Sequence, residues 1–88
     1  MQPSAFFHDA SGAVRFWVLA EGGGFVGASI AKEVLHYRFR ADRGGSDALP
    51  TYLAHREEID AAVLRRLAKG SLEPVMLREI DVAAVPGQ

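Results

Sequence analysis

The chain contains no cysteine, which excludes disulfide bonds and metal sites built on thiolates. It also contains no run of about 20 apolar residues, the length that a membrane-spanning helix needs. Neither sign of charge dominates, because 10 lysines and arginines and 11 acidic residues leave a formal net charge of −1. We therefore expect no strong long-range attraction to nucleic acid or to anionic lipid.

The composition is that of an ordinary globular protein, with 49% hydrophobic and 24% charged residues among 88. We expect a single small domain over residues 1–88, with its core at about 4–82 and a flexible C-terminal tail at 83–88. The first residues lack the charged start and the apolar stretch of a secretion signal, so the expected location is the cytoplasm.

A glycine-rich stretch, GGGFVG at residues 22–27, matches the G-x-G-x-x-G pattern of dinucleotide-binding loops. In such a loop the helix begins among the glycines, and a second parallel strand follows it. Here FVGAS alternates as a strand does, and the helical stretch that follows ends in the loop-like DRGGSD. The glycines therefore predict the turn of a β-hairpin, because glycine tolerates positive φ. A nucleotide-binding loop is the alternative.

Hydrophobic periodicity predicts the element order β-β-β-α-α-β. Short turns make neighbouring strands antiparallel. The expected fold is therefore an α+β two-layer sandwich, with an antiparallel four-stranded sheet and two helices on one face. Ser29 is the candidate N-cap of the first helix. The expected elements are an edge strand at 4–8, strands at 13–20 and 25–30, helices at 29–41 and from 47–50 to 70, and a strand at 75–82.

No pattern in the chain indicates catalysis. The three histidines, His8, His36 and His55, lie on different expected elements and lack metal-ligand spacing. Neither a catalytic triad nor a nucleophile elbow can be assembled. We therefore predict no catalytic, cofactor-binding or metal-binding residues, no cofactor and a non-enzymatic role.

Charged residues interrupt the apolar arcs of both predicted helices. Arg56 and Asp60 lie one turn apart within the arc of the second helix, and Arg38 lies among the apolar positions of the first. A charge in a core is costly unless it is paired. The three residues are therefore either members of internal salt bridges or contacts to a protein partner or a second copy of the chain.

A basic stripe follows the first helix, formed by Lys32, His36, Arg40 and Arg43. Because Tyr37 and Phe39 lie between these residues, the stripe is a candidate surface for phosphates and stacked bases. An ordinary solvated helix face is the alternative, since Glu33 lies in the same arc and the net charge is slightly negative.

Four segments, AVRFWVLAEGG, IAKEVLHYRF, YLAHREEIDAAVLRRLAKG and VMLREIDV, resemble a small bacterial family catalogued as domain of unknown function 1488. The resemblance extends from about Phe6 to Val82 and includes the positions of Arg56 and Ile59. The family usually has Ile-Ser where this chain has Ile30 followed by alanine, so Ser29 is the substitute cap. The family has no assigned activity, so the resemblance implies no site residue.

The sequence thus predicts a cytoplasmic accessory domain that binds a protein partner or a second copy of itself, with Arg38, Arg56 and Asp60 as candidate interaction residues. A weak nucleic-acid-binding module using the basic stripe is the alternative.

Overall fold

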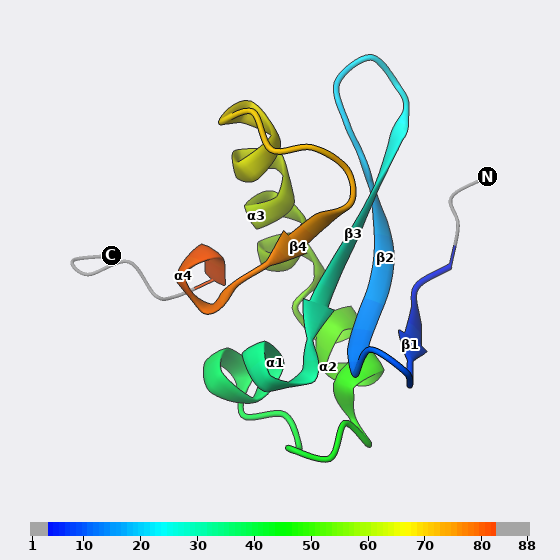
Figure 1. Cartoon of the computed structure of the whole chain (residues 1–88), viewed down its shortest axis with the longest axis vertical. Helices are drawn as coiled ribbons and strands as arrows, with labels where there is room; N and C mark the ends of the chain where they lie inside the picture. Colours follow the sequence, from blue (N-terminus) through cyan, green and yellow to red (C-terminus); the bar gives the residue numbers. More distant parts are fainter. Residues whose placement is uncertain (1–3, 83–88) are drawn as a thin grey trace.

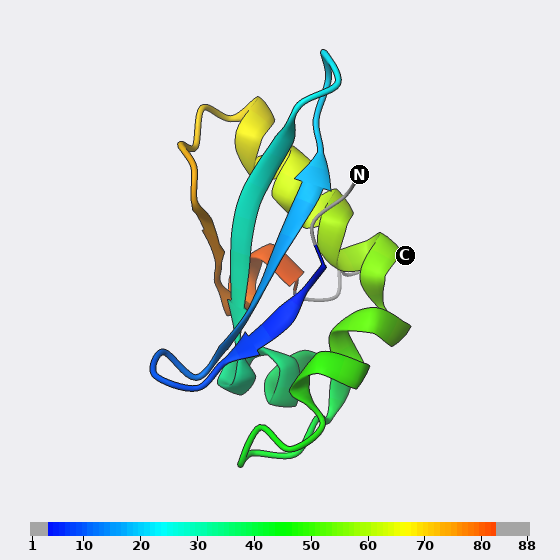
Figure 2. The ribbon, with the colours of Figure 1, turned by 90° about the vertical axis from the view of Figure 1, so that its right-hand side faces the viewer.

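A four-stranded sheet with the strand order β1-β2-β3-β4 forms one layer of the structure, and the helices form the other (Figures 1 and 2). This architecture, described for residues 4–82 by a computed structural model, confirms the predicted α+β two-layer fold. The strands are β1 (Phe6–His8), β2 (Ala13–Leu19), β3 (Phe25–Ala31) and β4 (Val75–Leu77). The helices are α1 (Lys32–Phe39), α2 (Ala48–Ala54), α3 (Arg56–Ala68) and α4 (Glu79–Val82).

The predicted hairpin is confirmed. β2 and β3 pair antiparallel along their whole length, from Ala13 opposite Ala31 to Leu19 opposite Phe25. The turn between them closes where the Ala20 amide donates to the Gly24 carbonyl at 2.8 Å. Gly22 and Gly23 have φ values of 93° and 89°, a region that side chains with a Cβ rarely adopt. The glycine-rich stretch therefore reverses the chain, and no helix begins within it.

The sheet is antiparallel except at its last pair, where β4 runs parallel to β3, with Ser29 opposite Met76. The sequence-based expectation of a fully antiparallel sheet is corrected at this pair. The helical segment between β3 and β4 returns the chain to the end of the sheet where β3 begins. A strand that starts at that end must run in the direction of β3.

The observed helices differ from the predicted ones in two places. β3 continues through Ala31, so α1 begins at Lys32, and Ser29 lies within the strand instead of capping the helix. The second predicted helix is broken at His55, which has φ −118° and ψ 25° and separates α2 from α3. The His55 ring stacks on Phe39 at a centroid distance of 4.0 Å. No helix in the described range 4–82 has the length and apolar character for a membrane span.

The predicted strand at 75–82 is strand only as far as Leu77, and α4 follows it. The Asp81 carboxylate stabilises the turn between β4 and α4, because its Oδ2 accepts from the Arg78 backbone amide at 2.7 Å. The same oxygen accepts from Arg66 Nη1 at 2.8 Å, and that guanidinium also donates to the Met76 carbonyl at 3.0 Å. Asp81 and Arg66 thereby attach β4 and α4 to α3. The predicted tail at 83–88 lies outside the described residues.

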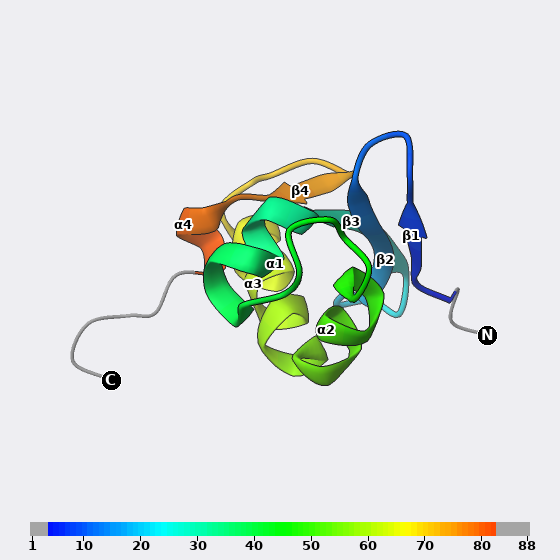
Figure 3. The ribbon, with the colours of Figure 1, turned by 90° about the horizontal axis from the view of Figure 1, so that it is seen from below.

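The core lies between the sheet and the helices, which Figure 3 shows grouped on one side of the strands. Alternating residues of β2 point into it, and the Phe16 ring packs against Tyr52 of α2 at a centroid distance of 4.5 Å. Its largest fully buried side chains are Tyr52, Phe16, Ile30, Leu35, Ile59, Val14, Val63, Val75 and Val82.

Candidate functional site

The predicted interaction residue Arg38 binds within the chain. Its Nε donates to the Val82 carbonyl of α4 at 2.7 Å, and its Nη2 lies 2.9 Å from the Glu58 carboxylate of α3. Its guanidinium carbon also lies 5.0 Å from the centre of the Phe39 ring. Arg38 therefore joins α1 to α3 and α4, which accounts for a cation among the apolar positions of its helix.

Arg56 and Asp60 form the internal pair that their spacing allows, with 3.6 Å between Arg56 Nε and Asp60 Oδ2. The Tyr52 hydroxyl donates to Asp60 Oδ1 at 3.0 Å. Burial raises the pKa of Asp60, against the lowering effects of the Tyr52 hydrogen bond and Arg56. Burial also raises the pKa of Tyr52, and the Asp60 carboxylate adds to that rise. The Asp60 carboxylate thereby links α3 to α2, and Arg56 is its ion-pair partner within α3.

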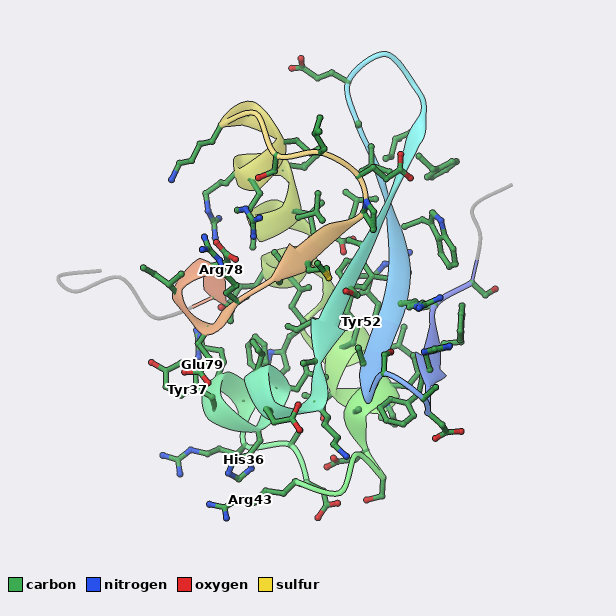
Figure 4. All side chains as sticks on the ribbon, in the orientation of Figure 1. His36, Tyr37, Arg43, Tyr52, Arg78 and Glu79 are labelled. Atoms are coloured by element: carbon green, nitrogen blue, oxygen red, sulfur yellow. The ribbon has the colours of Figure 1, made fainter. Side chains whose placement is uncertain are left out.

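An open pocket of about 700 Å³ lies beside α1. Its lining comes from α1, from the segment that follows it and from α4. Figure 4 shows the labelled lining residues His36, Tyr37, Arg43 and Glu79 along one side of the molecule. The complete lining is Glu33, His36, Tyr37, Arg40, Arg43 and Glu79.

Two hydrogen bonds hold the imidazole of His36 in this pocket. Its Nδ1–H donates to the Ala41 carbonyl at 2.7 Å. Its Nε2 accepts from Arg43 Nε at 3.0 Å. A neutral imidazole with its proton on Nδ1 satisfies both bonds. The second bond also orients the Arg43 guanidinium, whose terminal nitrogens form no hydrogen bond or ion pair within residues 4–82.

The structure brings together three of the four residues of the predicted basic stripe. His36, Arg40 and Arg43 line the pocket, whereas Lys32 does not. The Lys32 side chain lies instead against two glycines, with its Cδ 3.3 Å from the position that a Cβ on Gly45 would occupy. Sequence reasoning missed Glu79, which reaches the pocket from α4 and carries no local signal of that position.

Arg40 ends α1 in a left-handed conformation, with φ 63° and ψ 27°. Its backbone amide donates to the His36 carbonyl at 3.0 Å. Glycine is the residue that usually occupies this position after a helix, because a Cβ is disfavoured there. Arginine at this place therefore costs folding free energy and directs a cation toward the pocket.

Arg40→Gly is expected to raise the free energy of unfolding by about 0.5–1 kcal/mol, since relief of the left-handed strain exceeds the added entropy of the unfolded chain. The midpoint of thermal unfolding, followed by circular dichroism, should rise by roughly 2–6 °C. Arg40→Ala keeps a Cβ at the same φ and should leave the midpoint nearly unchanged. An equal rise in both variants would show that strain is not the cause.

The side of the sheet opposite the helices is covered by no other element among the described residues (Figure 2). We call it the open face. Phe6, Arg15, Ser29 and Met76 form one row across it, as the pairing of the four strands requires. The Phe6 and Trp17 rings lie 6.1 Å apart, and Met76 is 66% exposed. The outward side chains include Phe6, Arg15, Trp17, Leu19, Phe25, Ser29 and Met76.

The alternation of AVRFWVL by itself indicates that Arg15, Trp17 and Leu19 share one face of β2. Phe6 and Met76 were missed as surface residues, because only the strand order shows which residues lie beside them. At the edge of this face the Gly27 amide donates to the Glu73 carboxylate at 2.7 Å. Gly27, the last glycine of the G-x-G-x-x-G match, therefore donates its amide to an acidic group.

No group of three or more His, Asp and Glu side chains within the described part of the chain is arranged to hold a metal ion. Comparison of the chain with models of protein families, with curated proteins and with solved structures finds no match. The open face and the pocket beside α1 are the candidate sites within the described residues.

Proposed function

We propose that the protein is a non-enzymatic interaction domain that self-associates through the open face of its sheet, acting in the cytoplasm. The single observation that carries the proposal is the number of large apolar side chains exposed on that face. Leu19 is 56% exposed and Met76 is 66% exposed, with Phe6 and Phe25 partly exposed on the same side. Large apolar side chains that gather on one face in contact with water are typical of an interaction surface.

The occupant that we propose is a second copy of the chain, because the open face carries both signs of charge. Arg15 extends from the middle of β2 on this face. The Glu73 carboxylate lies at its edge, beside Gly27. In a two-fold arrangement the same patch contacts itself, so Arg15 of one copy can face Glu73 of the other.

The size of the open face predicts a weak dimer. Four strands at their usual spacing and seven residues along the longest strands span roughly 20 by 23 Å. Two such faces bury on the order of 1,000 Å² in total, which is the range of weak and transient interfaces. A dissociation constant on the order of 10–100 μM is expected for a patch of this size.

Leu19→Glu is expected to raise the dissociation constant of the dimer by at least about tenfold, because it places a carboxylate in the apolar contact. Sedimentation velocity over a concentration series, to about 1 mM protein, measures this constant directly. Leu53→Glu is the matched control, since Leu53 is 51% exposed but lies on α2, in the helical layer.

The control should dimerise as the unchanged chain does. A strict monomer of the unchanged chain at the highest concentration would overturn self-association. Equal loss of dimer in both leucine variants would place the interface outside the open face.

The second candidate function is weak nucleic-acid binding, and one observation favours it. His36, Arg40 and Arg43 line the same pocket, as a basic site for a phosphate backbone requires. We rank it second because Lys32 lies outside the pocket and two carboxylates share its lining.

We also propose that the chain is a member of the family catalogued as domain of unknown function 1488. The support is the sequence resemblance from about Phe6 to Val82. Since that family has no assigned activity, membership adds no catalytic residue and agrees with an accessory role.

A further inference from the structure

Two guanidinium groups in the α1 pocket form no ion pair with any residue that the structure describes. Arg40 forms no side-chain hydrogen bond or ion pair within residues 4–82, and Arg43 uses only its Nε, to His36. Guanidinium groups bind phosphate with two parallel N–H donors. Arg43 is oriented by the imidazole, and the left-handed backbone of Arg40 places that residue at the end of α1 beside the pocket. The pocket therefore presents two guanidinium groups that can bind an anionic group.

The same pocket contains two carboxylates, Glu33 and Glu79, and neither forms an ion pair with Arg40 or Arg43. Counted with these arginines and a neutral His36, the lining has no net charge. A simple polyanion gains little from such a site. A ligand that combines an anionic group with N–H donors can bind both the arginines and the carboxylates of the pocket.

Tyr37 adds a flat aromatic surface between these charges. Its side chain lies on α1, is 53% exposed and forms no hydrogen bond in the described part of the chain. Aromatic side chains of this kind stack with nucleobases. The pocket volume of about 700 Å³ also lies within the range of small-molecule sites.

We infer that the α1 pocket binds a cytosine nucleotide, whose base carries an exocyclic amino group. Arg40 and Arg43 receive the phosphate, Tyr37 stacks on the base, and Glu33 or Glu79 accepts from the amino group. A carboxylate recognises cytosine in this way, whereas uracil offers it an oxygen. The inference deepens the second candidate function and does not depend on the open face. The ligand is a free nucleotide or a base within a single strand.

The test is a titration of the full ¹⁵N-labelled chain with CMP and UMP, followed by amide chemical shifts of residues 33–43. The two nucleotides differ at the group that the carboxylates read. CMP is expected to bind at least about tenfold more tightly than UMP, because UMP would leave a carboxylate facing an oxygen. Inorganic phosphate and cytidine, each of which fills only part of the pocket, should bind more weakly than CMP.

Substitutions of single pocket residues test the role of each residue in binding. Arg43→Ala and Tyr37→Ala should each weaken CMP binding roughly tenfold, whereas Tyr37→Phe keeps the stacking ring and should bind as the unchanged chain does. Arg40→Gly should weaken binding although it stabilises the fold, which separates loss of the ligand from unfolding. Replacement of both Glu33 and Glu79 by Gln should reduce the preference for CMP. Arg78→Ala is the control, since Arg78 is exposed on the neighbouring segment and lies outside the pocket lining.

Equal affinity for CMP, UMP and inorganic phosphate would overturn the inference. Single-stranded oligo(C) and oligo(U) form the last arm of the experiment. Tighter binding of oligo(C) than of CMP, with a steep salt dependence, identifies a nucleic-acid strand as the source. Tighter binding of CMP identifies the free nucleotide. Binding of both oligonucleotides without base preference would leave nucleic-acid binding standing and remove the pocket inference, whereas no binding of any ligand would remove both.

Discussion

Tyr52→Ala is expected to lower the free energy of unfolding by about 3–5 kcal/mol, the loss typical of a large aromatic side chain removed from a core. Tyr52, labelled in Figure 4, is completely buried. Its ring packs on Phe16 of β2. It is therefore a main contact between α2 and the sheet. Because small domains have only about 5–15 kcal/mol in total, the variant should be partly unfolded at moderate temperature. Urea denaturation followed by circular dichroism measures the change.

Tyr52→Phe is the matched comparison, because it keeps the ring and removes the hydroxyl that donates to Asp60. A smaller loss of about 1–3 kcal/mol is expected at neutral pH, where the partly buried carboxylate loses a donor. The pKa of Asp60 is raised in the folded chain, first by burial. The folded chain therefore loses stability as pH rises from the pKa of Asp60 in the unfolded chain to its raised pKa in the folded chain. The defect should therefore shrink in acid, where Asp60 is protonated. An equal defect at both pH values would contradict this role for the hydroxyl.

Asp81→Ala is expected to lower the free energy of unfolding by about 2–3 kcal/mol at neutral pH. The Asp81 side chain is 10% exposed, and its Oδ2 accepts from the Arg78 amide and from Arg66 Nη1. Removing the carboxylate leaves the Arg66 guanidinium without its counter-ion and frees the turn into α4. Urea denaturation at neutral pH provides the value.

The loss should depend on pH in a defined direction. Burial alone would raise the pKa of Asp81, but the hydrogen bonds from the Arg78 amide and the Arg66 guanidinium outweigh it and lower the pKa. A carboxyl group with a lowered pKa stabilises the fold at pH values above its pKa in the unfolded chain. That stabilisation is lost as pH falls through its pKa in the folded chain. The difference between Asp81→Ala and the unchanged chain should therefore shrink as pH falls through the lowered pKa of Asp81.

Arg78→Ala is the control for this network. The Arg78 side chain is 67% exposed and lies 3.5 Å from Asp81, whereas its backbone amide provides the shorter bond and survives the substitution. The expected loss is below about 1 kcal/mol, as for an exposed ion pair. A loss as large as that of Asp81→Ala would mean that the side-chain pair, and not the turn, holds α4.

The β2–β3 hairpin was predictable because its information is local. Glycine at 22 and 23 permits a positive φ, and alternation in AVRFWVL separates Val14, Phe16 and Val18 from the residues of the open face. Helical spacing likewise placed His36 and Arg40 on one side of α1, and both line the pocket. In each case, residues within one or two turns of the chain determine the result.

Other features depend on residues that are distant in the sequence. The sequence alone determined an α+β domain, the hairpin and the two faces of β2, since backbone preference and side-chain period act over a few residues. The tertiary structure decided that β4 runs parallel to β3, because a chain that returns through the helices enters the sheet at the starting end of β3. It also decided that Arg38 binds α3 and α4 internally and that Glu79 reaches the pocket. Both outcomes depend on which elements pack together. That packing is determined by the burial of apolar side chains from the whole chain in one core.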